Sequence, residues 1–157
     1  MAVPGLTLIG ESINDSVPST KKLFDENDVA GLLELARSQD EKGAAWIDVN
    51  VGLRPPAFMA DLVRKLQTVT RKPLSIDSPD PAIARAALEA DDPGLADGRP
   101  PILNSISPLR LEMFDLWRVR PFIPILLASE RFEAGASCAN ANRTAEETWL
   151  TARSLLE

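Results

Sequence analysis

Short apolar segments alternate with longer amphipathic segments from one end of the chain to the other. The apolar segments lie near 6–10, 45–49, 74–77, 102–104 and 122–127. Each is a short and nearly continuous run of apolar residues, which is typical of a parallel strand that is buried on both faces. The pattern therefore predicts an α/β fold in which each strand is followed by a helix.

The segments between these strands carry the signals of helix boundaries. Helices are expected over about 27–42, 57–70 and 81–90. Asp80 followed by Pro81 is a favourable N-cap and first helical position, and Ser107 followed by Pro108 predicts a further helix in the same way. The stretch 91–101 is polar and contains proline and glycine, so it is predicted to be a loop.

A last helix is predicted to begin after Thr144. The Thr144 hydroxyl can accept from the Glu147 amide while the Glu147 side chain accepts from the Thr144 amide, which is a capping box. The spacing of Trp149, Ala152 and Leu156 puts these three residues on one face of that helix.

The number of strand and helix units suggests a partial barrel. Five βα units are present in 157 residues, whereas a closed barrel has eight and needs roughly 250 residues. The sequence therefore predicts that 1–157 form the N-terminal portion of a (β/α)8 TIM-barrel-type domain. Two alternatives are a natural half-barrel that covers its sheet edges with another chain, and a five-stranded open sheet of the flavodoxin-like kind.

Carboxylate and amide side chains stand at the ends of the predicted strands. Because the carboxyl ends of parallel strands meet at one rim of a barrel, these side chains are expected to form one site. The candidate residues are Glu11, Asn14, Asp48, Asn50, Asp77 and Asn104.

Composition narrows the chemistry of that site. The net charge of −6 and the lack of a basic stripe argue against a nucleic-acid partner. The chain has no histidine, which excludes a Ser-His-Asp triad and His-containing zinc sites, and no metal-ligand cluster is expected from the spacing.

Compartment signals are few. No apolar run is long enough to cross a membrane, and the N-terminus lacks the pattern of a signal peptide, so a cytoplasmic protein is expected. Cys138 cannot form an internal disulfide because it is the only cysteine, and it lies in a predicted loop.

Four motifs at these strand ends resemble the pterin-binding methyltransferases, which include methyltetrahydrofolate:corrinoid methyltransferases and the folate module of cobalamin-dependent methionine synthase. The motifs are Ile-Gly-Glu-Ser-Ile-Asn at 9–14, Asp-Val-Asn-Val-Gly at 48–52, Leu-Ser-Ile-Asp-Ser-Pro-Asp at 74–80 and Leu-Asn-Ser-Ile-Ser at 103–107. Ser12 departs from the arginine common in the first motif. Dihydropteroate synthases share the barrel and the pterin, but their first-strand and glycine-rich motifs are not seen here.

The resemblance implies roles for individual residues. Asp77 would accept hydrogen bonds from the pterin ring nitrogen and exocyclic amine, and Asn104 would stabilise the N5-protonated state of methyltetrahydrofolate. Asp48 and Asn50 would help to form the pterin pocket, with a weaker expectation for Glu11 and Asn14.

The resemblance also implies an activity and partners. The chain would move a methyl group between N5 of tetrahydrofolate and the cobalt of a corrinoid (cobalamin) protein, with tetrahydrofolate or methyltetrahydrofolate as substrate. A homodimer is expected. Because the family draws further pterin contacts from later strands, this chain alone should bind pterin weakly or not at all. The alternatives are a non-catalytic half-barrel that self-assembles and a dihydropteroate-synthase-like enzyme.

Overall fold

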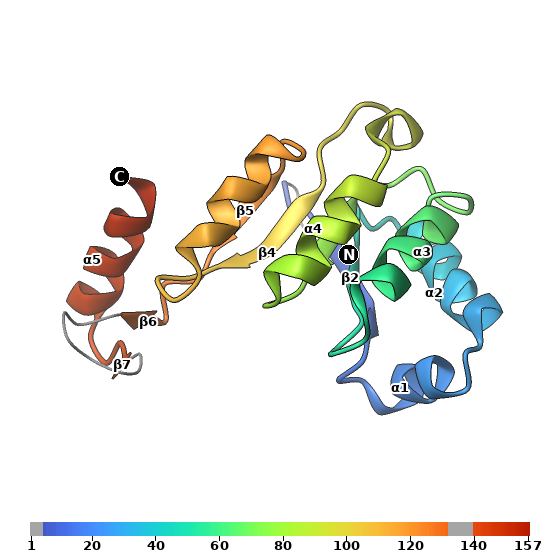
Figure 1. The fold of residues 1–157 in the computed structure, drawn as a ribbon, viewed down its shortest axis with the longest axis horizontal. Coiled ribbons are helices and arrows are strands. Elements are labelled where there is room, and N and C mark those ends of the chain that lie inside the picture. The colour runs from blue at the N-terminus through green and yellow to red at the C-terminus, as the bar shows by residue number, and fades with distance from the viewer. Residues whose placement is uncertain (1–4, 132–139) are drawn as a thin grey trace.

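Five parallel strands form one sheet in the order in which they occur along the chain (Figure 1). The computed structural model describes residues 5–131 and 140–157. The strands are β1 (Ile9–Asn14), β2 (Trp46–Asn50), β3 (Leu74–Asp77), β4 (Ile102–Ile106) and β5 (Ile123–Leu126). All four neighbouring pairs are parallel, so the carboxyl ends of the strands lie at the same edge of the sheet.

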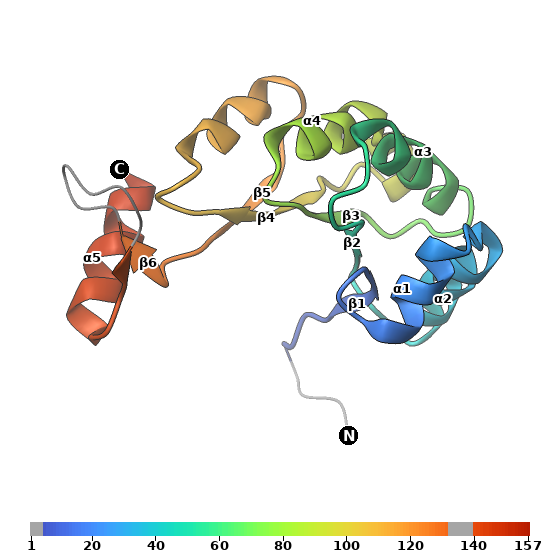
Figure 2. The same cartoon turned by 60° about the horizontal axis from the view of Figure 1, so that its bottom comes forward.

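The connecting helices lie along one side of the sheet and leave its other side uncovered (Figure 2). They are α1 (Pro18–Asp25), α2 (Val29–Glu41), α3 (Pro56–Leu66), α4 (Pro81–Ala90), and the short 3-10 helices η1 (Pro93–Ala96) and η2 (Leu111–Arg118). Sequential strand order with helices on one side is consistent with a partial TIM-barrel-type fold. The flavodoxin-like alternative was wrong, because that fold has the order 2-1-3-4-5 and helices on both sides.

The hydrophobic core lies between the sheet and these helices. Apolar side chains at alternate strand positions are fully buried there, namely Ile47, Val49, Leu74, Ile76 and Leu103. Because side chains alternate along a strand, the residues between them face the uncovered side. That side therefore carries the polar residues of the strands.

Two strands extend further into the polar motifs than the sequence predicted. β1 was expected over 6–10 but runs to Asn14, and β4 was expected to end at Asn104 but runs to Ile106. Ile13 and Ile106 are fully buried, so each strand continues past its polar residues to another core position. The register shifts once in each of these stretches, which interrupts the simple alternation that sequence patterns detect.

Most predicted helices are confirmed, with boundaries that differ by a few residues. The Asp80 cap is present, since its side chain accepts from the amides of Ala82 and Ile83. Ser107 does not cap a helix directly. Its hydroxyl accepts from the Leu109 amide in a turn, and the 3-10 helix η2 begins only afterwards. Helix α1 and the short helix η1 were not predicted.

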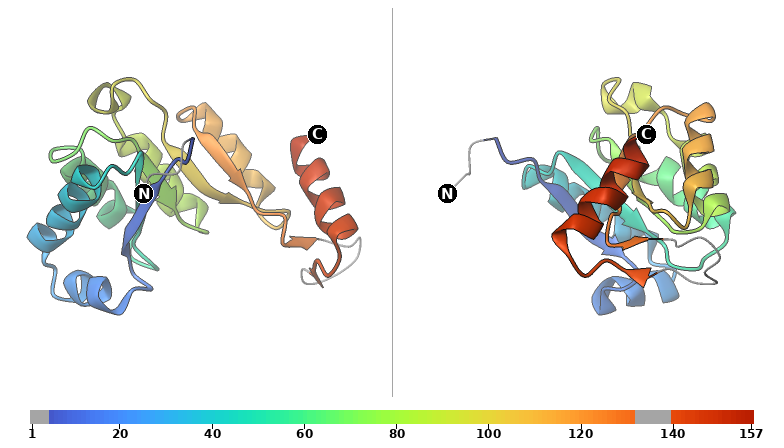
Figure 3. Two further views of the ribbon diagram at one scale, coloured as in Figure 1. Left: turned by 180° about the vertical axis from the view of Figure 1, so that it is seen from behind. Right: turned by 90° about the vertical axis from the view of Figure 1, so that its left-hand side faces the viewer.

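The last helix, α5 (Ala145–Leu156), lies beyond β5, at the opposite end of the molecule from α1 and α2 (Figure 3). It is preceded by two short antiparallel strands, β6 (Glu130–Arg131) and β7 (Asn140–Ala141). The predicted capping box of Thr144 and Glu147 is confirmed. The face formed by Trp149 and Leu156 is exposed, however, because α5 buries Thr151 and Leu155 instead. Cys138 lies outside the described residues.

Each edge strand of the five-stranded sheet has a feature that limits further pairing. The Ile123 amide donates to the carbonyl oxygen of Pro101, just before β4, and the Leu127 amide donates to that of Ile106 in β4. Because neighbouring backbone amides of a strand point in opposite directions, the nitrogen of Pro124 lies at the free edge, and this nitrogen carries no hydrogen. At the other edge, the backbone amide of Ser12 donates to the Gln39 side chain, and the backbone carbonyl of Ser12 accepts from the Thr20 hydroxyl. Over the described residues, no helix is long and apolar enough to cross a membrane.

Candidate functional site

Three of the predicted site residues form a row across the carboxyl ends of neighbouring strands. Asp77 in β3 is directly paired with Asn104 in β4. On the other side, the Asn50 amide nitrogen in β2 donates to Asp77 Oδ2 at 2.9 Å. The Asn50 oxygen accepts from the Gly52 amide at 2.8 Å, which turns its nitrogen toward Asp77. The row thus presents a carboxylate flanked by two amides on the uncovered side of the sheet.

A second row lies two residues nearer the amino ends of the strands, on the same face of the sheet. Asp48 is paired with Ser75, whose hydroxyl donates to Asp48 Oδ1 at 2.6 Å. Asp48 is only 1% exposed, and its other oxygen, Oδ2, is buried without a hydrogen-bond partner. Glu11 approaches from β1, so that one carboxylate oxygen from each of Glu11, Asp48 and Asp77 lies within 4.8 Å of the other two.

Burial makes the carboxyl groups of Asp48 and Asp77 weaker acids than usual, with a raised pKa. The pKa of Asp48 is raised to about 7, mainly by desolvation and also by the charges of Asp77 and Glu11, while hydrogen bonds from Ser75 and Asn104 oppose the rise. Desolvation also raises the pKa of Asp77, and the hydrogen bond from Asn50 opposes that rise. The site therefore combines strong hydrogen-bond acceptors with carboxyl groups that exchange protons closer to neutral pH.

Asn14 has a different position from the other candidates. Its side-chain oxygen accepts from the amide of Ser16 at 2.9 Å and from the Ser16 hydroxyl at 2.7 Å, and the residue is 7% exposed. These bonds stabilise the turn that follows β1. The structure therefore brings together Glu11, Asp48, Asn50, Asp77 and Asn104, with Asn14 ordering the loop beside them.

Comparison with known proteins gives one informative match. A methylcorrinoid:tetrahydrofolate methyltransferase of Eubacterium limosum is 35% identical to this chain over 108 residues. The chain is a relative of this methyltransferase. The matched region covers 65% of the chain but 36% of the relative, so the chain spans about a third of that protein's length. No family model matches the chain.

In this chain, Arg54 holds the loop beside the site, between β2 and α3. Its guanidinium donates to Asp15 at 2.5 Å and to Asp25 at 2.7 Å, and it stacks over the Phe24 ring at 4.6 Å from the centroid. The side chain is 19% exposed. Arg54 thus joins the loops after β1 and β2 to helix α1, and its role is structural.

Replacing Arg54 by Lys should lower the free energy of unfolding by about 1–2 kcal/mol. Lysine keeps the charge, but it has a single compact ammonium in place of a planar fork that contacts two carboxylates and an aromatic face. Chemical denaturation measures the loss. The control is Arg64→Lys on the exposed side of α3, which should change stability by less than about 0.5 kcal/mol. Equal effects of the two substitutions would contradict the structural role of Arg54.

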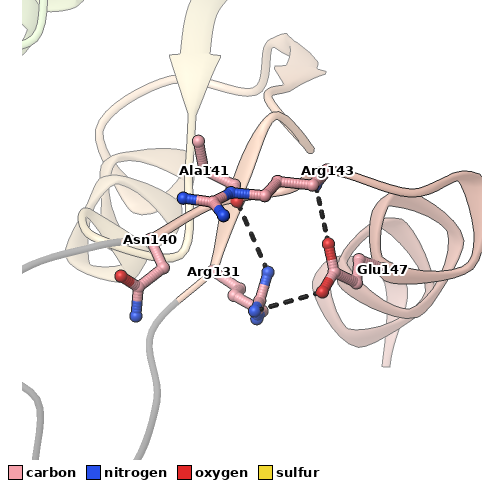
Figure 4. A pocket seen from close by; sticks show the side chains of 5 residues that line it. All are labelled: Arg131, Asn140, Ala141, Arg143 and Glu147. Carbon is pink, nitrogen blue, oxygen red and sulfur yellow. Dashed lines mark hydrogen bonds and ion pairs between the residues drawn. The ribbon is translucent and has the colours of Figure 1, made fainter.

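A polar pocket of about 330 Å³ lies away from the strand ends, between the β6–β7 pair and the start of α5 (Figure 4). Arg131 pairs with Glu147 at 3.2 Å, and the backbone amide of Arg143 donates to the same carboxylate at 2.6 Å. These contacts fasten the short strands to the helix. They account for the polar lining of this pocket without a ligand.

The spacing of the site residues along the chain contains a signal that the motifs alone do not use. Asn50, Asp77 and Asn104 are separated by 27 residues each, and so are Asp48 and Ser75. Equal spacing in consecutive βα units puts residues at the same height in a parallel sheet. This regularity could have identified Ser75 as a partner of Asp48 and could have predicted both rows.

Proposed function

We propose that this chain is the N-terminal part of a pterin-binding domain that moves a methyl group between N5 of tetrahydrofolate and the cobalt of a corrinoid protein. The observation that carries the proposal is the row of Asn50, Asp77 and Asn104, which offers a carboxylate between two amides at the carboxyl ends of the strands. The sequence identity to a methylcorrinoid:tetrahydrofolate methyltransferase supports the same chemistry.

Asp77 is suited to anchor a pterin. One of its oxygens accepts from Asn50, and both oxygens of a carboxylate can accept from two adjacent N–H donors, such as a ring nitrogen and an exocyclic amine. Asp48 and Asn50 would complete the floor of the pocket, and Glu11 would lie at its β1 side. Asn14 would contribute by holding the loop after β1.

Asn104 would act on the reacting nitrogen. Breaking the bond between N5 and the methyl carbon leaves an electron pair on nitrogen, and a proton on N5 makes that nitrogen a better leaving group. The Asn104 side-chain oxygen can accept a hydrogen bond from protonated N5 and so favour this form in the transition state. The corrinoid, carried by a partner protein, supplies the cobalt that donates or receives the methyl group.

Titration with methyltetrahydrofolate tests the proposal. The gene product that contains this chain should bind methyltetrahydrofolate, as measured by calorimetry or by tryptophan fluorescence. The 157-residue chain alone should bind more weakly, because the described sheet provides only one side of a pocket. Absence of binding by the whole gene product would overturn the pterin assignment.

Replacing Asn104 by Ala should lower the methyl-transfer rate by about 100-fold while changing the affinity for methyltetrahydrofolate much less. The reason is that its hydrogen bond is strongest when charge develops on N5. Single-turnover kinetics with the corrinoid partner measure the rate, and calorimetry measures the affinity. Ser105→Ala is the neighbouring control. A loss in affinity as large as the loss in rate would remove Asn104 from the chemical step.

A second candidate is a non-catalytic half-barrel that assembles with another copy as a homodimer. The observation that favours it is the open side of the sheet, where Ile9 is 40% exposed and Ile123 is 42% exposed. Light scattering separates the two candidates, because a stable oligomer without pterin binding supports assembly. A dihydropteroate-synthase-like enzyme would instead consume p-aminobenzoate and release diphosphate.

A further inference from the structure

The three clustered carboxylates come from three different strands. Glu11 lies in β1, Asp48 in β2 and Asp77 in β3, and one oxygen from each lies within 4.8 Å of the others. Glu11 is exposed, Asp77 is half-buried and Asp48 is buried. Because 37 and 29 residues separate the three along the chain, no ligand spacing is visible in the sequence. The cluster exists only once the parallel sheet has formed.

The negative charge of this cluster has no basic partner among the described residues. No ion pair there involves Glu11, Asp48 or Asp77. The groups that act on the carboxylates as hydrogen-bond donors are neutral, namely Ser75 and Asn104 on Asp48 and Asn50 on Asp77. The charged groups that act on Asp48 are the other two carboxylates. Holding three ionised carboxylates together in this way is unfavourable unless one of them takes up a proton or a positive charge joins them.

A separate observation concerns a single buried atom. Asp48 is 1% exposed, its Oδ1 is occupied by the Ser75 hydroxyl, and its Oδ2 is buried without a hydrogen-bond partner. A buried carboxylate oxygen without a partner costs free energy, and a bound ion or water is one way in which such an atom is satisfied. On Asp77, the Asn50 amide occupies Oδ2, and Oδ1 is left for a ligand.

We propose that Glu11, Asp48 and Asp77 bind a divalent cation of the hard class, such as Mg²⁺, Mn²⁺ or Ca²⁺. These cations prefer carboxylate and water oxygens, and the site contains no sulfur or imidazole ligand that would favour zinc or copper. Three carboxylates leave several coordination positions for water, which can enter from the exposed side at Glu11. The inference does not rest on the methyl-transfer proposal, since it concerns the protein without folate.

Terbium luminescence tests this cation site. Trp46 is two residues before Asp48 in the same strand, so its side chain leaves the same face of the sheet from a Cα about 7 Å along the strand. Excitation of tryptophan should therefore produce Tb³⁺ emission that saturates in the metal-free 157-residue chain. Mg²⁺ or Ca²⁺ should displace the Tb³⁺. Calorimetry with Ca²⁺ and Mg²⁺ provides a second, non-optical measurement.

Two substitutions assign the binding to this cluster. Asp48→Asn and Glu11→Gln should each weaken Tb³⁺ binding by at least about 10-fold, because each removes one charged ligand. Asp80→Asn, which changes an exposed carboxylate at the N-cap of α4, should leave the affinity within about twofold. Circular dichroism verifies folding, and the exposed Glu11 remains a test if the Asp48 variant does not fold.

Different results of these titrations support or overturn the cation site. Saturable binding that both cluster substitutions weaken and that Mg²⁺ or Ca²⁺ reverses supports the site. The inference is overturned by an absence of saturable binding in both measurements, by binding that Glu11→Gln leaves unchanged, or by Tb³⁺ binding that neither divalent cation displaces. These titrations contain no methyltetrahydrofolate, so a failure of the cation site is distinguishable from a failure of the pterin site, although both use Asp77.

Discussion

Replacing Asp77 by Ala should lower the affinity of the full gene product for methyltetrahydrofolate by at least about 100-fold. A carboxylate that accepts two hydrogen bonds from the pterin contributes about 1.5–3 kcal/mol for each bond, and 1.4 kcal/mol corresponds to a factor of ten. The substitution also leaves the Asn50 amide without its acceptor, so it removes the contact to Asn50 as well as the carboxylate that would bind the pterin. Calorimetry measures the change in affinity.

Two further variants distinguish recognition from general damage. Asp77→Asn preserves the shape and can still accept from Asn50, but its amide nitrogen opposes a pterin donor, so it should bind nearly as weakly as the Ala variant. Asp80→Ala removes a carboxylate three residues away that caps α4, and it should reduce stability by about 1 kcal/mol with little effect on affinity. Unchanged binding in both Asp77 variants would refute the anchor role.

Lowering the pH from 8 to 5 should raise the free energy of unfolding, and Asp91 should supply a large part of the change. Desolvation raises the pKa of Asp91 from 3.8 to about 6, and the nearby Arg120 opposes the rise. A carboxyl group with a raised pKa binds its proton more tightly in the folded state. Its destabilising charge is therefore fully present above pH 6 and is lost as the pH falls toward 4.

The Asp91→Asn variant isolates this contribution. Its side-chain oxygen can still accept from Gln67, which donates to Asp91 at 2.9 Å, while the buried charge is removed. At pH 8 the variant should be more stable than the original chain by about 1–3 kcal/mol, given 1.36 kcal/mol per pKa unit and the loss of the Arg120 contact. At pH 5, which lies between the two pKa values, the difference should fall to about half of that, and it should vanish only near pH 4. Urea denaturation across this pH range measures both values.

A surface carboxylate provides the control for the pH experiment. Asp97 is exposed and has a φ of 54°, a conformation that asparagine also tolerates, so Asp97→Asn should change stability by less than about 0.5 kcal/mol at either pH. If Asp91→Asn behaved like Asp97→Asn, burial would not control the titration of Asp91. Asp48 titrates in the same direction, so some pH dependence should persist in the Asp91 variant.

Strand order and the positions of most elements followed from the sequence because the alternation of buried strands with amphipathic helices is local information. The Asp80 cap and the capping box at Thr144 were predicted for the same reason, since each needs only three or four neighbouring residues. The carboxyl ends of β1 and β4 were not predicted correctly, because the buried residues Ile13 and Ile106 lie beyond polar residues that resemble a loop.

The residues of the site were predicted from local motifs, but the contacts between them were not. The motifs identified Asp48, Asn50, Asp77 and Asn104 one strand at a time, and the structure places them in two adjacent rows. Glu11 was expected at the same rim, but how closely its carboxylate approaches Asp48 depends on the register of β1 across the irregularity between Gly10 and Ile13, which the sequence does not specify. The structural role of Arg54 depends on Asp15 and Asp25, which belong to separate parts of the chain.

Pro124 has a consequence for the behaviour of the chain at high concentration. A flat parallel sheet with two open edges is a template on which further chains can add strand by strand and form fibrils. Pro124 removes one donor from the β5 edge, and the side chains of Gln39 and Thr20 occupy the backbone of Ser12 in β1. Each edge of the five-stranded sheet therefore offers fewer free backbone groups to an added strand of another chain.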